Sequence, residues 1–196
     1  YVKDFSEVIA QVIASWGDTG EINVFDAIRT LEQRVGFKIW IGEEETQDGV
    51  WQQFKQHFDV LSQENAFVSP QQTLETLTSG KAREKQAVAE IMALVGNIVA
   101  QREAEQSWPD DNFTFLYQRF KSDDPHVTLR KLTHNIINAN QGFLSNLYAA
   151  LCWSLINIKL YPDTQRRLEA EIAVTKERFG DNFHASQEAL DSMRFC

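Results

Sequence analysis

Apolar residues recur at helical spacing along most of this chain, and few residues interrupt them. The first such run lies at 3–16, where Val8, Val12 and Trp16 follow a period near that of a helix. Only four prolines and nine glycines occur among the 196 residues, so little in the sequence ends a helix. No segment alternates apolar and polar residues for long. The pattern therefore predicts an all-α protein.

Breaks in this pattern divide the chain into separate helices. We expect helices at 3–16, 50–66, 81–106, 112–121, 129–160, 162–179 and 185–195, with a linker at 67–80 that contains a short helical piece at 71–77. In the segment after Gly20 a helical period runs from Phe25 to Ile39 and ends at Gly42. The segment Asp123-Asp124-Pro125 is predicted to be a turn, and Thr128 is predicted to cap the helix that follows. We expect one helical domain over residues 1–196.

Composition excludes several classes of function. Lys and Arg number 19 and Asp and Glu number 28, which gives a net charge of −9 and disfavours binding to nucleic acid or anionic lipid. Cys152 and Cys196 make no disulfide framework and no secretory signal opens the chain, so we expect a cytoplasmic protein. A membrane anchor outside this chain is left open. Because Tyr1 stands where Met would begin a gene product, we expect a longer or processed protein.

The most apolar part of the chain is the run FLSNLYAALCWSLINIKLY at 143–161. Its length approaches that of a membrane span, but polar residues such as Asn146, Asn157 and Lys159 make a span unfavourable. A helix that is apolar on nearly all sides in a soluble chain is predicted to be buried. We therefore expect 129–160 to form a long central helix with the others packed around it, and no membrane segment.

Polar side chains form a stripe along this predicted helix. Asn138, Gln141, Gly142, Ser145 and Asn146 step by three and four residues, so they share one face. Buried polar groups need hydrogen-bonding partners, and a contact with a neighbouring helix would provide them. Alternatively the stripe lines a ligand pocket, in which Gly142 lets a flat group approach the backbone closely. The sequence leaves both interpretations open.

Trp153 is followed by the segment PDTQRRLEAEI at 162–172. In order and spacing this resembles the cytochrome P-450 family of haem-thiolate oxygenases, in which a distal helix with a tryptophan precedes a proline and a helix of this kind. Upstream, DTGEINVFD at 18–26 and AQRE at 100–103 show weaker similarity. The resemblance covers nearly the whole chain and implies the distal helical half of that fold, without its N-terminal strands or its C-terminal haem-thiolate segment.

Counting back from Pro162 places the pocket motif of the family on the segment GFLSN at 142–146. The resemblance implies the following site residues: Gly142, Phe143 and Asn146 for haem, Asn146 and Ser145 for catalysis, and Asn138, Gln141 and Phe58 for substrate. Ser145 and Asn146 replace the acid and the threonine of the family motif, and an amide does not titrate, so the usual proton relay is not expected. The spacing from Asn146 to Trp153 is similar to the branch of prostacyclin synthase and sterol 7-alpha-hydroxylase.

Two other family motifs do not occur in this sequence. No Glu-x-x-Arg and no Phe-x-x-Gly-x-x-x-Cys are found, so Cys196 is not expected to be the axial thiolate. The axial thiolate tunes this haem for oxygen chemistry, and we expect no monooxygenase turnover from this chain alone. The four histidines, His57, His126, His134 and His184, show no zinc spacing, and no metal ligand is predicted.

Two functions are compatible with these residues. The first is part of a cytochrome P-450-like haem protein that, when complete, oxidises or rearranges a hydrophobic small molecule with the help of a redox partner protein. The second is a helical binding or interaction module derived from that fold, without haem. By the resemblance, Phe54, Phe58 and Phe67 would roof a hydrophobic pocket, and the alternative is that they pack in the core. Whether the chain is an enzyme is left open.

Overall fold

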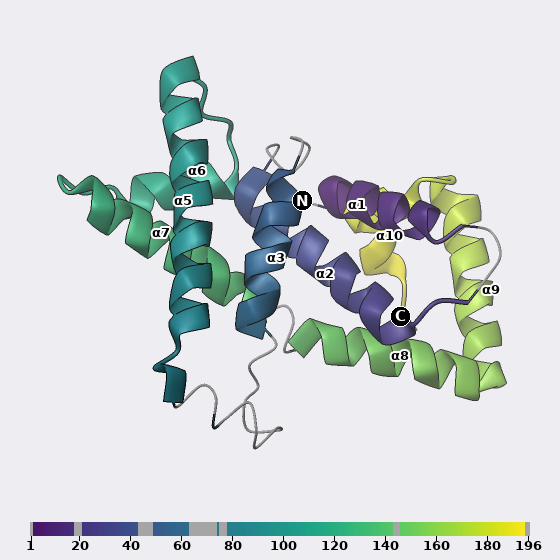
Figure 1. Cartoon of the computed structure of the whole chain (residues 1–196). Coiled ribbons are helices and arrows are strands. Elements are labelled where there is room, and N and C mark those ends of the chain that lie inside the picture. The colour runs from purple at the N-terminus through teal and green to yellow at the C-terminus, as the bar shows by residue number, and fades with distance from the viewer. Residues whose placement is uncertain are drawn as a thin grey trace. The chain divides into compact units, whose positions relative to one another are not determined.

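The computed structural model describes residues 2–17, 21–42, 49–62, 74, 78–142 and 146–194. Within these ranges the regular structure is entirely helical, which confirms the predicted all-α class (Figure 1). The elements are α1 Val2–Ser15, α2 Val24–Ile41, α3 Val50–Ser62, α5 Ala82–Glu105, α6 Asn112–Phe120, α7 Pro125–Gly142, α8 Tyr148–Leu160, α9 Pro162–Phe179, the 3₁₀ turn η3 Phe183–Ala185 and α10 Gln187–Ser192. The predicted linker at 67–80, with its helical piece at 71–77, lies largely outside the described residues.

The chain divides into two compact units, which are described separately. The central unit comprises Gly36–Leu144, and the terminal unit comprises Tyr1–Val35 together with Ser145–Cys196. The single domain expected over residues 1–196 stays a prediction.

The central unit is built around α5. Figure 1 shows α3 beside α5, and α7 packs against α5 and α6. Its core includes a row of aromatic rings, in which Phe54 lies 4.7 Å from Phe37 and 5.2 Å from Phe58 between ring centroids. The remaining core residues are Ile41 of α2 and aliphatic side chains of α5 and α7, together with the buried face of α6. Aromatic pairs at these distances add to the hydrophobic stabilisation of the unit.

The terminal unit brings α1 together with the last helices of the chain. The hydroxyl of Ser6 donates a hydrogen bond to the carbonyl oxygen of His184 at 3.0 Å, and α10 packs against η3 and α9. The backbone N–H of Arg194 donates to the Glu171 carboxylate at 2.6 Å. Buried apolar residues of this unit include Val8 and Val12, which lie on one face of α1 as the sequence pattern predicts.

The predicted start of the helix at 129–160 is wrong. The structure has α7 from Pro125 to Gly142 and α8 from Tyr148 to Leu160, and residues 143–145 between them lie outside the described ranges. Asp124 caps α7, because its Oδ1 accepts the N–H of His126 at 2.8 Å, and Pro125 fits the first helical turn. Thr128 is therefore inside the helix and is not its cap, and the expected turn at 123–125 is a helix start.

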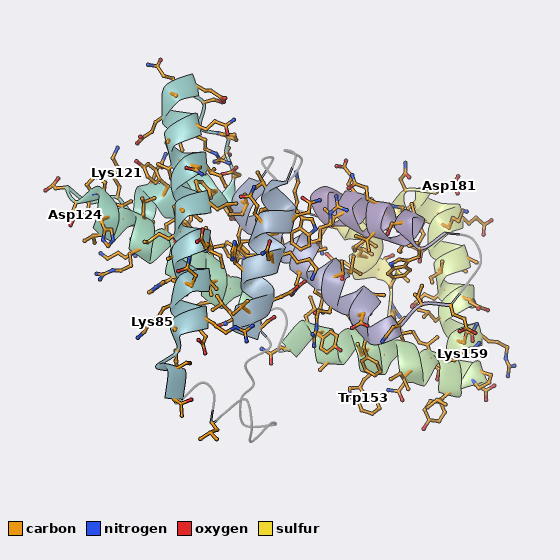
Figure 2. The ribbon with its side chains drawn as sticks, viewed as in Figure 1. Lys85, Lys121, Asp124, Trp153, Lys159 and Asp181 are labelled. Carbon is orange, nitrogen blue, oxygen red and sulfur yellow. The ribbon has the colours of Figure 1, made fainter. Side chains whose placement is uncertain are left out.

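The predicted burial of the apolar run at 143–161 is also wrong for the part that is described. Within α8 only Cys152 is buried, and the Trp153 side chain is 63% exposed and points away from the ribbon in Figure 2. The prediction assumed that neighbouring helices would cover every side of an apolar helix, whereas within the terminal unit α8 packs chiefly against α9. In the described ranges, no helix is both long and apolar enough to span a membrane.

Candidate functional site

Three of the predicted site residues lie at the end of α7, in the central unit. Asn138 is exposed, Gln141 is half-buried and Gly142 is exposed. Their spacing places them on one face of the helix. A Cβ atom added to Gly142 would meet no atom within 4 Å, so the space above this glycine is open. This part of the polar stripe faces outward and is not buried as expected.

Asn146 is the next described residue after Gly142 and belongs to the terminal unit. It is exposed, and with Leu147 it forms a π-helical turn directly before α8. Such turns interrupt the regular hydrogen-bond ladder of a helix and are frequent at functional sites. Ser145 and Phe143 lie outside the described residues. The roles assigned to these four residues of the motif, Gly142 included, stay predictions.

Phe58, assigned to the substrate site, lies inside the central unit. Its side chain is fully buried and stacks on Phe54 with an interplanar angle of 14°. Asn138 and Gly142 are exposed, so the structure gives Phe58 a different environment from theirs. Of the two interpretations of Phe58 that the sequence left open, the contacts of the isolated chain correspond to packing in the core.

Asn140 is a buried amide that the sequence pattern did not single out. It is 1% exposed, and its Nδ2 donates to the carbonyl oxygen of Ile136 at 2.8 Å. Its Oδ1 has no hydrogen-bond partner in the described structure and lies against Gly36 of α2, where a Cβ atom would collide with it. In the sequence Asn140 is an amide inside an apolar run. The polar stripe at helical spacing, which includes Asn138 and Gln141, lies on a different side of α7 and drew attention away from it.

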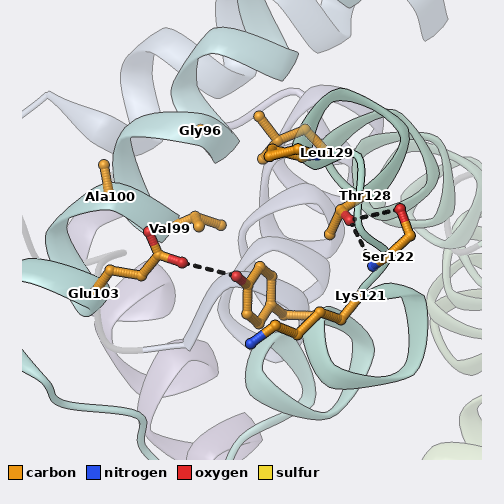
Figure 3. Close-up of a pocket in the computed structure, with 10 residues that line it drawn as sticks. Gly96, Val99, Ala100, Glu103, Lys121, Ser122, Thr128 and Leu129 are labelled. Atoms are coloured by element: carbon orange, nitrogen blue, oxygen red, sulfur yellow. Dashed lines mark hydrogen bonds between the residues drawn. The ribbon is translucent and has the colours of Figure 1, made fainter.

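The central unit contains a cavity of about 390 Å³ between α5, the end of α6 and the start of α7 (Figure 3). Its size lies within the range of small-molecule sites. The α5 wall has helical spacing, and the α7 wall begins at Pro125. The lining residues are Gly96, Val99, Ala100, Glu103, Tyr117, Lys121, Ser122, Pro125, Thr128 and Leu129. Sequence reasoning missed this cavity because its walls come from three helices, none of which carries a recognisable motif.

Tyr117 is the fixed polar centre of this cavity. Its hydroxyl donates to Glu103 Oε1 at 2.8 Å, and its ring stacks on Trp108 with centroids 4.5 Å apart. Burial and the Glu103 carboxylate raise the pKa of the phenol, so Tyr117 stays a neutral donor at physiological pH. Lys121 Nζ lies 5.8 Å from the centroid of the same ring.

The terminal unit contains a buried carboxyl group on α2. Glu32 is 1% exposed, and neither of its carboxylate oxygens has a hydrogen-bond partner in the described structure. Burial raises the pKa of Glu32 to about 7, since the charged form is poorly solvated there. Burial also raises the pKa of the Cys152 thiol on α8, an effect to which the Glu32 charge adds.

These features do not form a metal centre. In the parts of the chain that the structure describes, no three His, Cys, Asp or Glu side chains gather as metal ligands. Comparisons of the chain with models of protein families, with curated proteins and with solved structures give no match.

Proposed function

We propose that this chain forms the distal helical part of a cytochrome P-450-like haem protein that oxidises or rearranges a hydrophobic small molecule. The observation that carries the proposal is a π-helical turn in the pocket motif. This turn lies at Asn146 and Leu147, directly before α8. Asn146 belongs to the segment that the resemblance assigns to the cofactor, and among the described residues no other π-helical turn occurs.

The segment after this break also supports the proposal. The helix α9 begins with Pro162 in its first turn and carries Asp163 there, as the resemblance to the family requires. Ahead of it, α8 leaves Trp153, Leu155 and Leu160 between 44% and 65% exposed. Trp153 and Leu160 are seven residues apart and therefore share one face of α8, and an exposed apolar face is typical of a surface that another element or a ligand covers.

The exposed glycine of the motif suits a flat cofactor. The open space above Gly142 lets a planar group approach the backbone. Haem supplies the oxidising chemistry when it is bound, and its axial thiolate is not expected from this chain. Because the Asn146 amide does not titrate, it would position a substrate or a water molecule and would not transfer protons.

The alternative function, a binding module without haem, is favoured by a different observation. The cavity around Tyr117 lies wholly inside the central unit and needs no residue of the pocket motif. A small molecule held there would give the chain a binding function of its own.

Titration with haemin separates the two functions. Residues 1–196 are titrated with haemin while the Soret absorbance is recorded, and we expect saturable binding with one haemin per chain. Gly142→Leu places a side chain in the open space and should weaken this binding about tenfold, a loss of about 1.4 kcal/mol. Ala170→Leu, at an exposed position of α9, is the control and should leave binding unchanged.

Two outcomes would count against the haem proposal. One is the absence of saturable binding, and the other is equal affinity in the Gly142→Leu and Ala170→Leu variants. The reduced carbon monoxide complex provides a second readout. We expect it to lack the red-shifted Soret band of a thiolate-ligated haem, and a band of that type would overturn the statement that the axial ligand comes from elsewhere.

A further inference from the structure

The cavity around Tyr117 presents two opposite charges beside an apolar wall. Glu103 projects from α5 and Lys121 follows the end of α6, and both side chains line the cavity (Figure 3). In the described structure the two form no ion pair with each other, and Lys121 Nζ has only the aromatic ring as a partner. Its three N–H groups therefore remain available to a ligand.

Glu103 also has unused hydrogen-bonding capacity. One of its carboxylate oxygens accepts the Tyr117 hydroxyl at 2.8 Å, which orients the carboxylate toward the cavity. The other oxygen has no hydrogen-bond donor among the described residues and can accept from a ligand ammonium. A charge-assisted hydrogen bond of this kind is stronger than one between neutral groups.

The mouth of the cavity is held in a fixed shape near Lys121. The backbone N–H of Ser122 donates to Thr128 Oγ1 at 3.0 Å, and the Ser122 hydroxyl donates to the Asp124 carbonyl oxygen at 2.9 Å. Stacking on Trp108 holds the Tyr117 ring in place. Because these groups form hydrogen bonds or ring contacts with each other, they hold the cavity walls in place. Glu103 and Lys121 are then the groups that select the ligand.

The rest of the lining is apolar. Val99 and Ala100 on α5 line it together with Pro125 and Leu129 on α7. A Cβ atom at Gly96 would lie 3.6 Å from Leu129, so the glycine leaves space between the two helices. A volume of about 390 Å³ holds a molecule of roughly 10–15 heavy atoms with room to spare.

We propose that this cavity binds a small zwitterion with an apolar side chain, of the class of hydrophobic α-amino acids. The ammonium of the ligand pairs with Glu103, its carboxylate pairs with Lys121, and its side chain packs against Val99 and Leu129. An anion without an ammonium group would be repelled by the Glu103 carboxylate, and a cation without a carboxylate would be repelled by Lys121. The site therefore selects a zwitterion over singly charged ligands by repulsion as well as by attraction.

Three ligands that share one apolar body test this selectivity. They are L-phenylalanine, 3-phenylpropanoate and 2-phenylethylamine, which carry both charges, only the anion and only the cation. Their affinities for residues 1–196 are measured by calorimetry or by ligand-detected NMR. We expect L-phenylalanine to bind about tenfold more tightly than either singly charged compound, since one charge-assisted contact is lost in each.

Variants of the two charged residues assign the contacts. Lys121→Met should remove most of the advantage of L-phenylalanine over 2-phenylethylamine, and Glu103→Gln should remove most of its advantage over 3-phenylpropanoate. Lys85→Met is the matched control, because Lys85 is exposed on α5 and does not line the cavity (Figure 2). It should leave all three affinities unchanged, and circular dichroism confirms that each variant is folded.

The remaining outcomes decide against the proposal. If L-phenylalanine does not bind, or if one of the singly charged compounds binds equally well, the site does not recognise a zwitterion. Binding that survives in both charge variants would place the ligand elsewhere on the chain. Because none of these measurements uses haem, their failure is distinct from failure of the haemin titration.

Discussion

Arg102 holds both carboxylate oxygens of Asp111, with Nη1 donating to Oδ1 at 3.0 Å and Nη2 donating to Oδ2 at 2.7 Å. The Arg102 side chain is only 2% exposed. The guanidinium also donates to Thr114 Oγ1 at 2.8 Å and to the carbonyl oxygen of Ile41 at 3.2 Å. One buried cation thus ties α5 to the start of α6 and to the end of α2 within the central unit.

Removal of Asp111 should destabilise the central unit strongly. Asp111→Ala leaves a buried guanidinium without its counter-charge, which typically costs about 3 kcal/mol or more. It also removes the N-cap of α6, since Asp111 Oδ1 accepts the N–H of Thr114 at 2.8 Å. Urea denaturation followed by circular dichroism measures the change.

The control is an exposed ion pair of the same composition. Asp163 pairs with Arg166 on α9, and their side chains are 87% and 71% exposed. Asp163→Ala should change the free energy of unfolding little, because exposed pairs are screened by solvent. Equal effects of Asp111→Ala and Asp163→Ala would contradict the importance of the buried pair.

Gly42 lies beside this pair in a conformation that favours glycine. Its φ is +84°, and a Cβ atom there would collide with the Asp111 carboxylate and come within 3.2 Å of Arg102. Gly49 has the same φ, but its added Cβ would make only an ordinary contact at 3.7 Å with Gln53. Gly49→Ala should therefore lower the free energy of unfolding by about 1 kcal/mol, the cost of a positive φ at alanine. Gly42→Ala should lower it by more, because its Cβ atom also collides with neighbouring atoms. The melting temperatures of the two variants provide the comparison. A smaller decrease for Gly42→Ala would show that the Arg102 and Asp111 side chains can shift to make room for the new Cβ atom.

The buried carboxyl of Glu32 should make the stability of the terminal unit depend on pH. Its pKa is raised to about 7 in the folded chain, above the ordinary value of 4.5. Between these two values the folded state binds more protons than the unfolded state, so the free energy of unfolding falls as pH rises. The free energy of unfolding is therefore highest at pH below 4.5, where Glu32 is protonated in both states. Above pH 7 this part of the stability is lost completely. The shift corresponds to about 3 kcal/mol as an upper bound.

Glu32→Gln should remove this pH dependence. The neutral amide has a similar shape, so the variant should be more stable than the original chain at pH 8 and close to it at pH 5. Denaturation midpoints from pH 5 to pH 8 provide the measurement. Glu21→Gln, at an exposed position, is the control and should keep the slope of the original chain. A slope that persists in Glu32→Gln would mean that another group binds the proton.

Most helices of the chain were predictable because their signals are local. The spacing of Val8 and Val12 marks the buried face of α1, and the sequence around Pro162 marks the start of α9. The sequence does not give the start of α7, because Pro125 is typical of turns and is also favoured in the first turn of a helix. Asp124 carried the decisive signal, since its side chain caps α7.

Burial and the cavity could not be predicted in the same way. The apolar composition of α8 indicated a buried helix, but burial depends on which elements cover each side, and Trp153 is 63% exposed. The cavity depends on the distance between α5 and the start of α7, where a Cβ at Gly96 would be in contact with Leu129. Contacts between residues far apart in the sequence leave no periodic signal within either helix.

The contact between Gly36 and Asn140 joins α2 to α7 inside the central unit, and a double-mutant cycle can measure it. Gly36→Ala should destabilise the unit, because the new Cβ would collide with Asn140 Oδ1. Asn140→Ala alone loses the bond to Ile136 but also removes a buried oxygen that has no hydrogen-bond partner in the described structure, so its effect should be smaller.

The double variant carries the prediction. With the amide gone, the methyl group that Gly36→Ala introduces has room, so Gly36→Ala combined with Asn140→Ala should be more stable than Gly36→Ala alone. The coupling between the two positions should reach about 1 kcal/mol or more, measured by urea denaturation of all four chains. If the changes in free energy of unfolding of the two single variants simply add in the double variant, α2 and α7 do not approach each other at this glycine. The packing of α2 against α7 in the central unit would then have to be revised.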